Sequence, residues 1–336
     1  MQQTKPPFGP EQLMQLHMSM VPARVLSAAL RFDVFRHLEE GRDSAEGVAE
    51  AAGASPRGIR MLLDVLTALG LVEKRAGSYR AAEPARRYLL RSSEDYMGTM
   101  LEQDHLWQAW MALPEVIGSG KPARRVGDQQ AAEAFFPALV QALHVVHREP
   151  SRRAAAALTA GGKRGLRVLD VASGSGIWGI AIAEADPEAR VTAQDFPGLL
   201  PVTRRYAERH GVAGRFDYLG GDLKQVAFPA AAYDLALLGN IVHSEGEAAS
   251  RALFARLRPA LRPGGRIAII DMIPNDERTG PPYPLIFALN MLLNTEAGDT
   301  YTRAQYADWL AAAGFDPPES ADIGSHSPML VARRRD

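Results

Sequence analysis

The chain has 336 residues, about twice the usual ~100 to 200 residues of a domain, so we expect two domains. Its 38 Lys and Arg against 39 Asp and Glu residues give a net charge of -1, which provides no bulk attraction for nucleic acid or anionic lipid. The lack of cysteine excludes disulfides, thiolate nucleophiles and Cys-ligated metals. No run of roughly 18 apolar residues occurs, and the first residues lack a signal-peptide pattern. We therefore expect a soluble, cytoplasmic protein without a membrane partner.

Residues 1–100 have the pattern of a small, mainly helical domain. Apolar residues recur at helical spacing from Gln12 to Leu38, and Pro22 is the expected break between two helices. Segments 44–53 and 55–70 each begin with a serine suited to an N-cap and end with a glycine suited to a C-cap. Residues 71–80 then read as two short strands around a Gly-Ser turn. This order is typical of a winged helix.

A winged helix serves either DNA binding or protein packing. Residues 1–100 contain 13 Lys and Arg and 12 Asp and Glu, and the second helix of the pair has basic residues only near its start, at Arg57 and Arg60. DNA binding relies on basic side chains that meet phosphates. The sequence therefore favours a dimerisation module and predicts no nucleic-acid partner. A DNA-binding regulator is the alternative from another class of protein.

Residues 101–160 are predicted to form a helical linker, and residues 161–336 a catalytic domain. The linker contains an aromatic stretch with Trp107 and Trp110. From Arg167 onward, short apolar strands alternate with helical segments, as in a doubly wound parallel sheet. The expected fold class is α/β, a Rossmann-like doubly wound sheet preceded by a mainly helical winged-helix domain.

A strand, a glycine turn and a helix follow one another within residues 166–185. Gly174 and Gly176 permit close approach of the backbone to a ligand, and the start of the next helix presents unpaired N–H groups. Asp195 ends the second strand, where it can accept hydrogen bonds from ribose hydroxyls. Asp170 and Asp222 stand at the ends of the first and third strands. The sequence therefore predicts a nucleotide-type cofactor site with three acidic strand ends.

Two cofactors are compatible with this site. Residues 174–179 match the G-x-G-x-x-G pattern of dinucleotide sites, which is weak taken alone. The carboxylate of Asp170 would repel a pyrophosphate, whereas three acids suit the cationic amine, ribose hydroxyls and adenine amino group of S-adenosylmethionine. We therefore favour S-adenosylmethionine, with an NAD-dependent oxidoreductase as an alternative.

A histidine follows the fourth strand at the edge of the sheet where ligands bind. This residue, His243, comes after the strand at residues 233–238, and Asp271 follows the fifth strand. Histidine has an ordinary pKa of about 6.5 and can take a proton from a hydroxyl, while a carboxylate can orient the imidazole.

His144 and His147 lie three residues apart on an expected helix, but two ligands without a third are weak evidence for a metal. No metal site is predicted.

The chain resembles the class I S-adenosylmethionine-dependent methyltransferases. More narrowly, it resembles the caffeate-type and polyketide-type O-methyltransferases, which pair a winged-helix dimerisation domain with a Rossmann-like domain. The resemblance covers nearly the whole chain, and its most specific segments are residues 168–176, 194–197, 221–223, 237–243 and 261–267. It implies a homodimer that methylates a hydroxyl of a small aromatic or polyketide-like acceptor in secondary metabolism. It also admits C-methyltransferases and relatives that bind the cofactor without methylating.

The resemblance assigns roles to individual positions. His243 is the implied base, assisted by Asp271. The implied cofactor residues are Asp170, Gly174, Gly176, Asp195, Phe196, Asp222, Leu223 and Asn240. The implied acceptor residues are Trp107, Trp110, Phe287, Asn290, Met291 and Asn294. The chain departs from the family pattern at Ala172, which replaces the first glycine of the turn, at Ser244-Glu245, where Asp-Trp is common, and at Thr300, which replaces a second acid.

Overall fold

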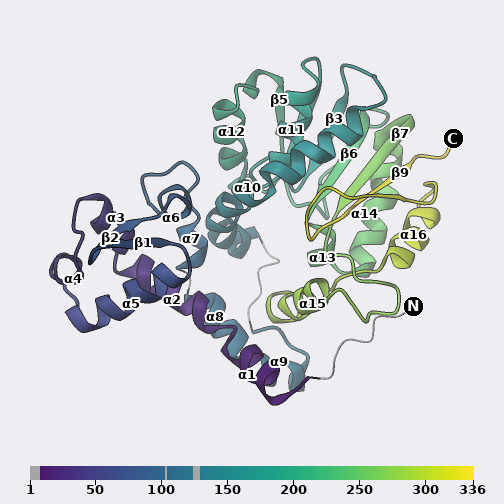
Figure 1. The fold of residues 1–336 in the computed structure, drawn as a ribbon. Coiled ribbons are helices and arrows are strands. Elements are labelled where there is room, and N and C mark those ends of the chain that lie inside the picture. Colours follow the sequence, from purple (N-terminus) through teal and green to yellow (C-terminus); the bar gives the residue numbers. More distant parts are fainter. Residues whose placement is uncertain (1–7, 103, 124–128) are drawn as a thin grey trace. The chain divides into compact units, whose positions relative to one another are not determined.

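The computed structural model describes residues 8–102, 104–123 and 129–336, with no side-chain detail at 104–106 (Figure 1). The chain divides into two compact units, Met1–Asp104 and His105–Asp336. Within the described ranges, no helix is both long enough and apolar enough to cross a bilayer.

The N-terminal unit consists of short helices and one hairpin. Its elements are α1 (Pro10–Met18), α2 (Val21–Arg31), α3 (Val34–Glu39), α4 (Ala45–Ala52), α5 (Pro56–Ala68), β1 (Val72–Arg75), β2 (Ser78–Ala81), α6 (Glu83–Tyr88) and α7 (Gly98–Leu101). The predicted serine caps are confirmed, because the hydroxyls of Ser44 and Ser55 accept hydrogen bonds from the N–H groups of Gly47 and Gly58. The hairpin turn lies one residue earlier than predicted, between Arg75 and Ser78.

The core of this unit is formed by the inner faces of its helices and hairpin. Phe35, Leu63 and Leu66 are almost completely buried there. Arg60, one of the two basic residues at the start of α5, donates a 2.9 Å hydrogen bond to Asp64 one turn later. Its charge is therefore partly neutralised within its own helix.

The C-terminal unit contains a seven-stranded sheet with helices on both faces. Its helices are α8 (Asp104–Met111), α9 (Leu113–Ser119), α10 (Gln129–Thr159), α11 (Ile177–Ala185), α12 (Leu200–Arg209), the 3₁₀ turn η1 (Ala213–Arg215), α13 (Val242–Glu245), α14 (Glu247–Ala260), α15 (Pro282–Asn294) and α16 (Arg303–Ala312). Its strands are β3 (Arg167–Val171), β4 (Arg190–Asp195), β5 (Phe216–Gly220), β6 (Tyr233–Gly239), β7 (Leu261–Ile270), β8 (Glu319–Ala321) and β9 (Met329–Arg333).

The strand order is β5-β4-β3-β6-β7-β9-β8, and β3 to β7 are parallel. This confirms the predicted α/β class. The pairs β7–β9 and β8–β9 are antiparallel, whereas the sequence predicted a parallel sheet. The last two strands therefore add an antiparallel pair beside β7, on one side of the parallel sheet.

Successive side chains of each strand point to opposite faces of the sheet, where they pack into two separate cores. In β3, Val168 packs in a cluster with residues of α10, α11 and α12, and Leu169 packs in a cluster with residues of α14 and α16. Because both faces are covered, β3 reads as an almost continuous apolar run. The polar residues that end the strands are thereby confined to the sheet edge.

The turn after β3 keeps its shape although alanine replaces its first glycine. Ala172 has a φ of 50°, in the left-handed region that favours glycine. Such a conformation costs a non-glycine residue on the order of 1 kcal/mol. The surrounding fold holds the strained residue in place, so this departure from the family pattern preserves the turn.

Candidate active site

The strand order reverses at β3, because β4 and β5 extend the sheet on one side and β6 and β7 on the other. In open α/β sheets, ligands bind outside the carboxyl ends of the strands at such a switch point. The turn after β3, Asp195, Asn240 and Asp271 all lie at carboxyl ends of these strands. The topology therefore brings most of the predicted site residues to one edge.

The glycine turn is fixed by β4 and α12. Gly174 and Gly176 have φ angles of 55° and 73°. The N–H of Gly174 donates to Asp195 Oδ2 at 2.8 Å, and its carbonyl accepts a 2.8 Å hydrogen bond from the Thr203 hydroxyl. A Cβ at position 176 would lie 2.7 Å from Thr203 Cγ2. Glycine is therefore required at 176 both by the backbone conformation and by the close contact.

Asp195 is a buried acid at the end of β4. Its two oxygens accept backbone hydrogen bonds from Gly174 and Phe196, each at 2.8 Å. Burial raises the pKa of Asp195 to about 6, although these two hydrogen bonds oppose the shift. A carboxylate oxygen has a second lone pair, so the anion can still accept hydrogen bonds from vicinal hydroxyls. Phe196 follows directly and is half-buried.

Asp170 lies beneath the turn rather than at its surface. It is 1% exposed, and its Oδ2 accepts a 3.0 Å hydrogen bond from the Gly179 N–H in α11. Its Oδ1 has no hydrogen-bond partner within the described residues. Burial raises the pKa of Asp170 to about 8, so at neutral pH the group is mostly protonated. Repulsion of a pyrophosphate by this residue is therefore weaker than the sequence suggested.

The end of β5 supplies the third acid. Asp222 is half-buried and its Oδ1 accepts a 2.9 Å hydrogen bond from the Lys224 N–H. Leu223 is buried, and its carbonyl accepts from Arg256 at 2.7 Å. The segment is thus held by α14, which contains Arg256.

Asn240 follows β6 and has a left-handed φ of 58°. Its amide nitrogen lies 3.4 Å from His147 Nε2, and its Oδ1 accepts a 3.3 Å hydrogen bond from the Ser327 hydroxyl. Burial lowers the pKa of His147 to about 4, so this imidazole is neutral and can accept the amide hydrogen. The side chain of Asn240 is therefore tied to α10 and to the segment before β9.

His243 and Asp271 form a buried pair. His243 Nδ1 lies 2.5 Å from Asp271 Oδ1, and the His243 N–H donates to Asp271 Oδ2 at 3.0 Å. His243 is 7% exposed and Asp271 is completely buried. Because a carboxylate only accepts, Nδ1 carries the proton and Nε2 of the neutral ring is left as the acceptor. Within the described residues, Nε2 of this ring makes no hydrogen bond to the chain.

The pair has a further partner that the sequence did not indicate. The hydroxyl of Tyr306, on α16, donates to Asp271 Oδ2 at 2.9 Å. No motif spacing points to this residue. The available signal is a tyrosine rather than a phenylalanine at a buried helix position, because a buried phenol needs a hydrogen-bond partner.

One of the predicted acceptor residues on α15, Phe287, contacts this pair. The ring of Phe287 meets the imidazole of His243 edge-on, with centroids 4.9 Å apart. Met291 is buried, and Asn294 Nδ2 donates to the Asn290 carbonyl at 2.8 Å. The buried Oδ1 of Asn294 has no partner within the described residues.

Two further acceptor residues were predicted on the linking helices. Trp107 and Trp110 are half-buried side chains of α8. Their place in the acceptor site stays a prediction.

The residues that depart from the family pattern at 244, 245 and 300 each have a contact with a nearby group. The Ser244 hydroxyl donates to the Ile241 carbonyl at 2.8 Å, and Glu245 lies 3.9 Å from Lys224. Thr300 is fully buried, and its carbonyl accepts from Arg278 at 2.7 Å. Asp271 is therefore the acid that contacts His243 in the described structure.

The two histidines considered as metal ligands have different partners. His144 Nε2 lies 3.2 Å from His210 Nε2, whereas His147 faces Asn240. Within the described residues, no group of three or more His, Cys, Asp or Glu side chains could hold a metal ion.

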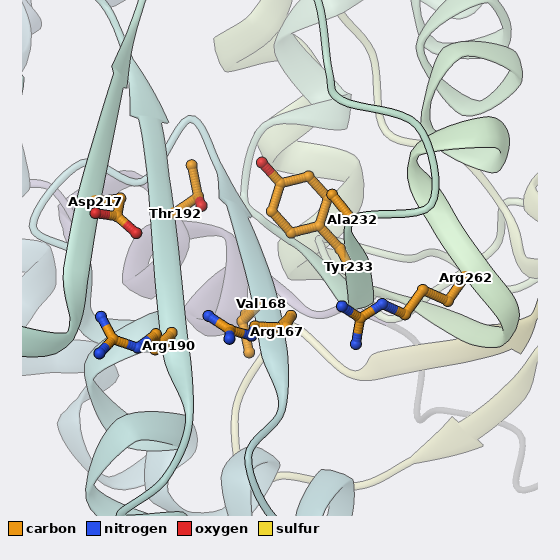
Figure 2. Close-up of a pocket in the computed structure, with 8 residues that line it drawn as sticks. All are labelled: Arg167, Val168, Arg190, Thr192, Asp217, Ala232, Tyr233 and Arg262. Atoms are coloured by element: carbon orange, nitrogen blue, oxygen red, sulfur yellow. The ribbon is translucent and has the colours of Figure 1, made fainter.

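A separate polar groove of about 280 Å³ lies at the opposite edge of the sheet. Arg167 and Arg190 are register partners at the amino ends of β3 and β4, and Figure 2 shows their side chains pointing the same way. Because this groove contains neither the glycine turn nor His243, it is not part of the candidate active site.

Comparison with known families agrees with this geometry. Residues 146–316 match the O-methyltransferase domain, and residues 14–91 match the O-methyltransferase dimerisation domain. The chain is 29% identical over 337 residues to the tetracenomycin polyketide synthesis 8-O-methyl transferase TcmO of Streptomyces glaucescens, covering 97% of each chain. It is 29% identical over 315 residues to a 3-hydroxy-5-methyl-1-naphthoate 3-O-methyltransferase of Streptomyces sahachiroi, covering 91% of this chain and 89% of that one.

A solved structure shows that the fold is shared. Human N-acetylserotonin methyltransferase in complex with SAM matches with a TM-score of 0.83 and 24% identity, covering 99% of this chain and 100% of that one. The dimerisation match lies within the N-terminal unit, and the catalytic match spans the glycine turn and the His243–Asp271 pair. The chain therefore belongs to the S-adenosylmethionine-dependent O-methyltransferases that carry an N-terminal dimerisation domain.

Proposed function

We propose that this enzyme methylates a hydroxyl group of a small aromatic or polyketide-like acceptor in secondary metabolism, with His243 as the general base. The observation that carries the proposal is the buried contact of 2.5 Å between His243 Nδ1 and Asp271 Oδ1. This contact leaves Nε2 of the imidazole available to an acceptor. The His243–Asp271 pair lies at the same edge of the sheet as the glycine turn, at the carboxyl ends of the strands.

The residues at the carboxyl edge fit S-adenosylmethionine. When bound, this cofactor supplies a methyl group on a positively charged sulfur. Gly174 and Gly176 would face its methionine portion, Asp195 its ribose hydroxyls, and Phe196, Asp222 and Leu223 its adenine. The turn at residues 172–176 has only small, uncharged side chains, and the carboxyl groups of Asp195 and Asp222 suit hydroxyl and amino groups of a ligand better than a phosphate. Asp170 and Asn240 would act by holding the turn and the end of β6.

Proton removal is the chemical task that falls to the chain's own residues. As the bond between the acceptor oxygen and the methyl carbon forms and the carbon–sulfur bond breaks, the hydroxyl proton moves to His243 Nε2. Asp271 then faces an imidazolium, whose charge it stabilises. Because Asp271 is completely buried, its negative charge is little screened by water.

An aromatic acceptor is supported by what lies beside the base. The ring of Phe287 contacts the imidazole of His243. An aromatic acceptor can therefore pack against Phe287 while the hydroxyl of the acceptor reaches Nε2 of His243. We further propose that Asn290, Met291 and Asn294 on α15, and Trp107 and Trp110 on α8, also line the acceptor site. The names of the Streptomyces relatives describe polyketide and naphthoate acceptors.

We also infer that the enzyme is a homodimer. The N-terminal unit matches a dimerisation domain. Its helix α1 exposes four large apolar side chains, of which Met14 and Leu16 are 60% and 62% exposed, together with Leu13 and Met18. Large apolar side chains exposed together on one helix mark a protein interface.

Charge on α1 should disrupt this dimer. We expect the double variant Leu13→Glu/Leu16→Glu to shift from dimer to monomer, because two carboxylates would be desolvated in the interface. Light scattering after size exclusion measures the mass, and Gln15→Glu on the same helix is the matched control. A dimer that persists in the double variant would exclude α1 from the interface.

Cofactor affinity should depend on the ionisation of Asp195. Only the ionised carboxylate accepts hydrogen bonds from both ribose hydroxyls, so affinity is expected to fall as the pH drops through about 6. Asp195→Asn should weaken S-adenosylhomocysteine roughly tenfold or more at pH 8 and flatten the pH dependence. Calorimetric titration from pH 5 to 8 measures both effects. Asp217→Asn, in the groove at the opposite sheet edge, is the control, and unchanged affinity in Asp195→Asn would refute the ribose role.

The base assignment predicts a selective loss of turnover. His243→Ala should lower kcat by roughly 10² to 10⁴, the usual contribution of a general base, while binding of S-adenosylhomocysteine stays within a few-fold. Steady-state kinetics with a panel of naphthols, alongside calorimetry, separates the two effects. His210→Ala removes an imidazole that contacts His144 and Glu184 instead, and should keep normal turnover. Full turnover in His243→Ala would contradict the proposal.

A further inference from the structure

The buried carboxylate of Asp271 accepts hydrogen bonds from four donors. His243 provides two of them, Nδ1–H to Oδ1 and the backbone N–H to Oδ2, and the Met272 N–H adds a 2.8 Å bond to Oδ1. The fourth is the hydroxyl of Tyr306, which donates to Oδ2 at 2.9 Å. Tyr306 lies far along the chain from the other three, so its contact is not a by-product of local backbone geometry.

Tyr306 is held rigidly in this position. It lies on α16, whose start is fixed by a reciprocal capping box between Thr302 and Gln305. Its side chain is fully buried and packs edge-on against Tyr301 and Trp309, with ring centroids 6.1 Å and 5.7 Å away. Burial and then the neighbouring Asp271 raise the pKa of Tyr306 well above its usual value, so the phenol remains a donor. The hydroxyl is therefore a donor to the carboxylate.

We propose that Tyr306 is a positioning residue that tunes the basicity of His243 through Asp271, an inference that rests on the base role proposed above. A carboxylate that shares its charge with a phenol donor attracts the imidazolium less strongly. The neutral imidazole, the form that can take the acceptor's proton, is then populated at lower pH. Tyr306 also holds Oδ2, so that Oδ1 stays aimed at Nδ1.

Other charged groups around the cluster of Tyr301, Tyr306 and Trp309 form ion pairs with one another. Arg278 bonds Asp299 at 3.0 Å, and Arg251 bonds Glu247 at 2.8 Å. Glu245, on the same helix as His243, has a pKa raised chiefly by burial, and Lys224, 3.9 Å away, and His243 both oppose this shift. None of these side chains has a hydrogen bond to Asp271 among the described contacts, so Tyr306 is the phenol that modulates it directly.

The test compares two tyrosines of the same cluster. Tyr306→Phe removes the hydroxyl that bonds Asp271 and keeps the ring. Tyr301→Phe is the matched control, because Tyr301 is also buried but its hydroxyl has no hydrogen-bond partner within the described residues. The readout is the pH profile of kcat/KM for a naphthol acceptor, with S-adenosylhomocysteine binding measured in parallel. A variant with 3-fluorotyrosine at position 306, a stronger donor, tests the opposite direction.

We expect the acidic limb of the Tyr306→Phe profile to move to higher pH by about 0.5 to 1 unit, because imidazolium is then favoured. The acidic limb of Tyr301→Phe should stay at its original pH, and the limb of the fluorinated variant should move to lower pH. Cofactor binding should be unchanged in all three variants. The inference would be overturned if the acidic limbs of Tyr306→Phe and Tyr301→Phe lay at the same pH. A shift of the Tyr306→Phe limb to lower pH would also overturn it. An acidic limb that persists in His243→Ala would instead overturn the base role, and with it this inference.

Discussion

A carboxylate with no exposed surface is stable in a protein only when donors surround it, and Asp271 meets this condition at the end of β7. Two of its donors come from His243, so satisfying the buried charge also fixes the imidazole and its protonated nitrogen. The site chemistry follows from this constraint. Nε2 becomes the free acceptor, Phe287 packs against the ring edge, and Tyr306 completes the shell of donors from another helix.

The sheet makes this arrangement compatible with a cofactor site. Parallel strands with both faces covered by helices are apolar through their length, so their polar residues collect at the ends. Asp195 at the end of β4 and His243 after β6 thus lie on the same edge without being near in sequence. The two acids hold different groups there, since Asp195 accepts a hydrogen bond from the glycine turn and Asp271 holds the imidazole of His243.

Sequence patterns predicted the parts of this enzyme that depend on local rules. Serine caps, the glycine turn, the strand ends and His243 follow from residue type and spacing, and the α/β class is confirmed. The antiparallel β8 and β9 were missed because strands of three and five residues carry little periodic signal. Tyr306 was missed because its role depends on packing between α16 and the end of β7, which no local pattern encodes. The burial of Asp170 was likewise hidden, because the sequence shows an acid at a strand end but not which way it points.

The most direct test of the central claim is the position of the transferred methyl group. A naphthol acceptor is incubated with cofactor whose methyl carbon is ¹³C-labelled, and the product is examined by carbon NMR. We predict the label on oxygen, in the chemical-shift range of an aryl methyl ether, because His243 is placed to take a hydroxyl proton. Label on a ring carbon would contradict the role assigned to the His243–Asp271 pair.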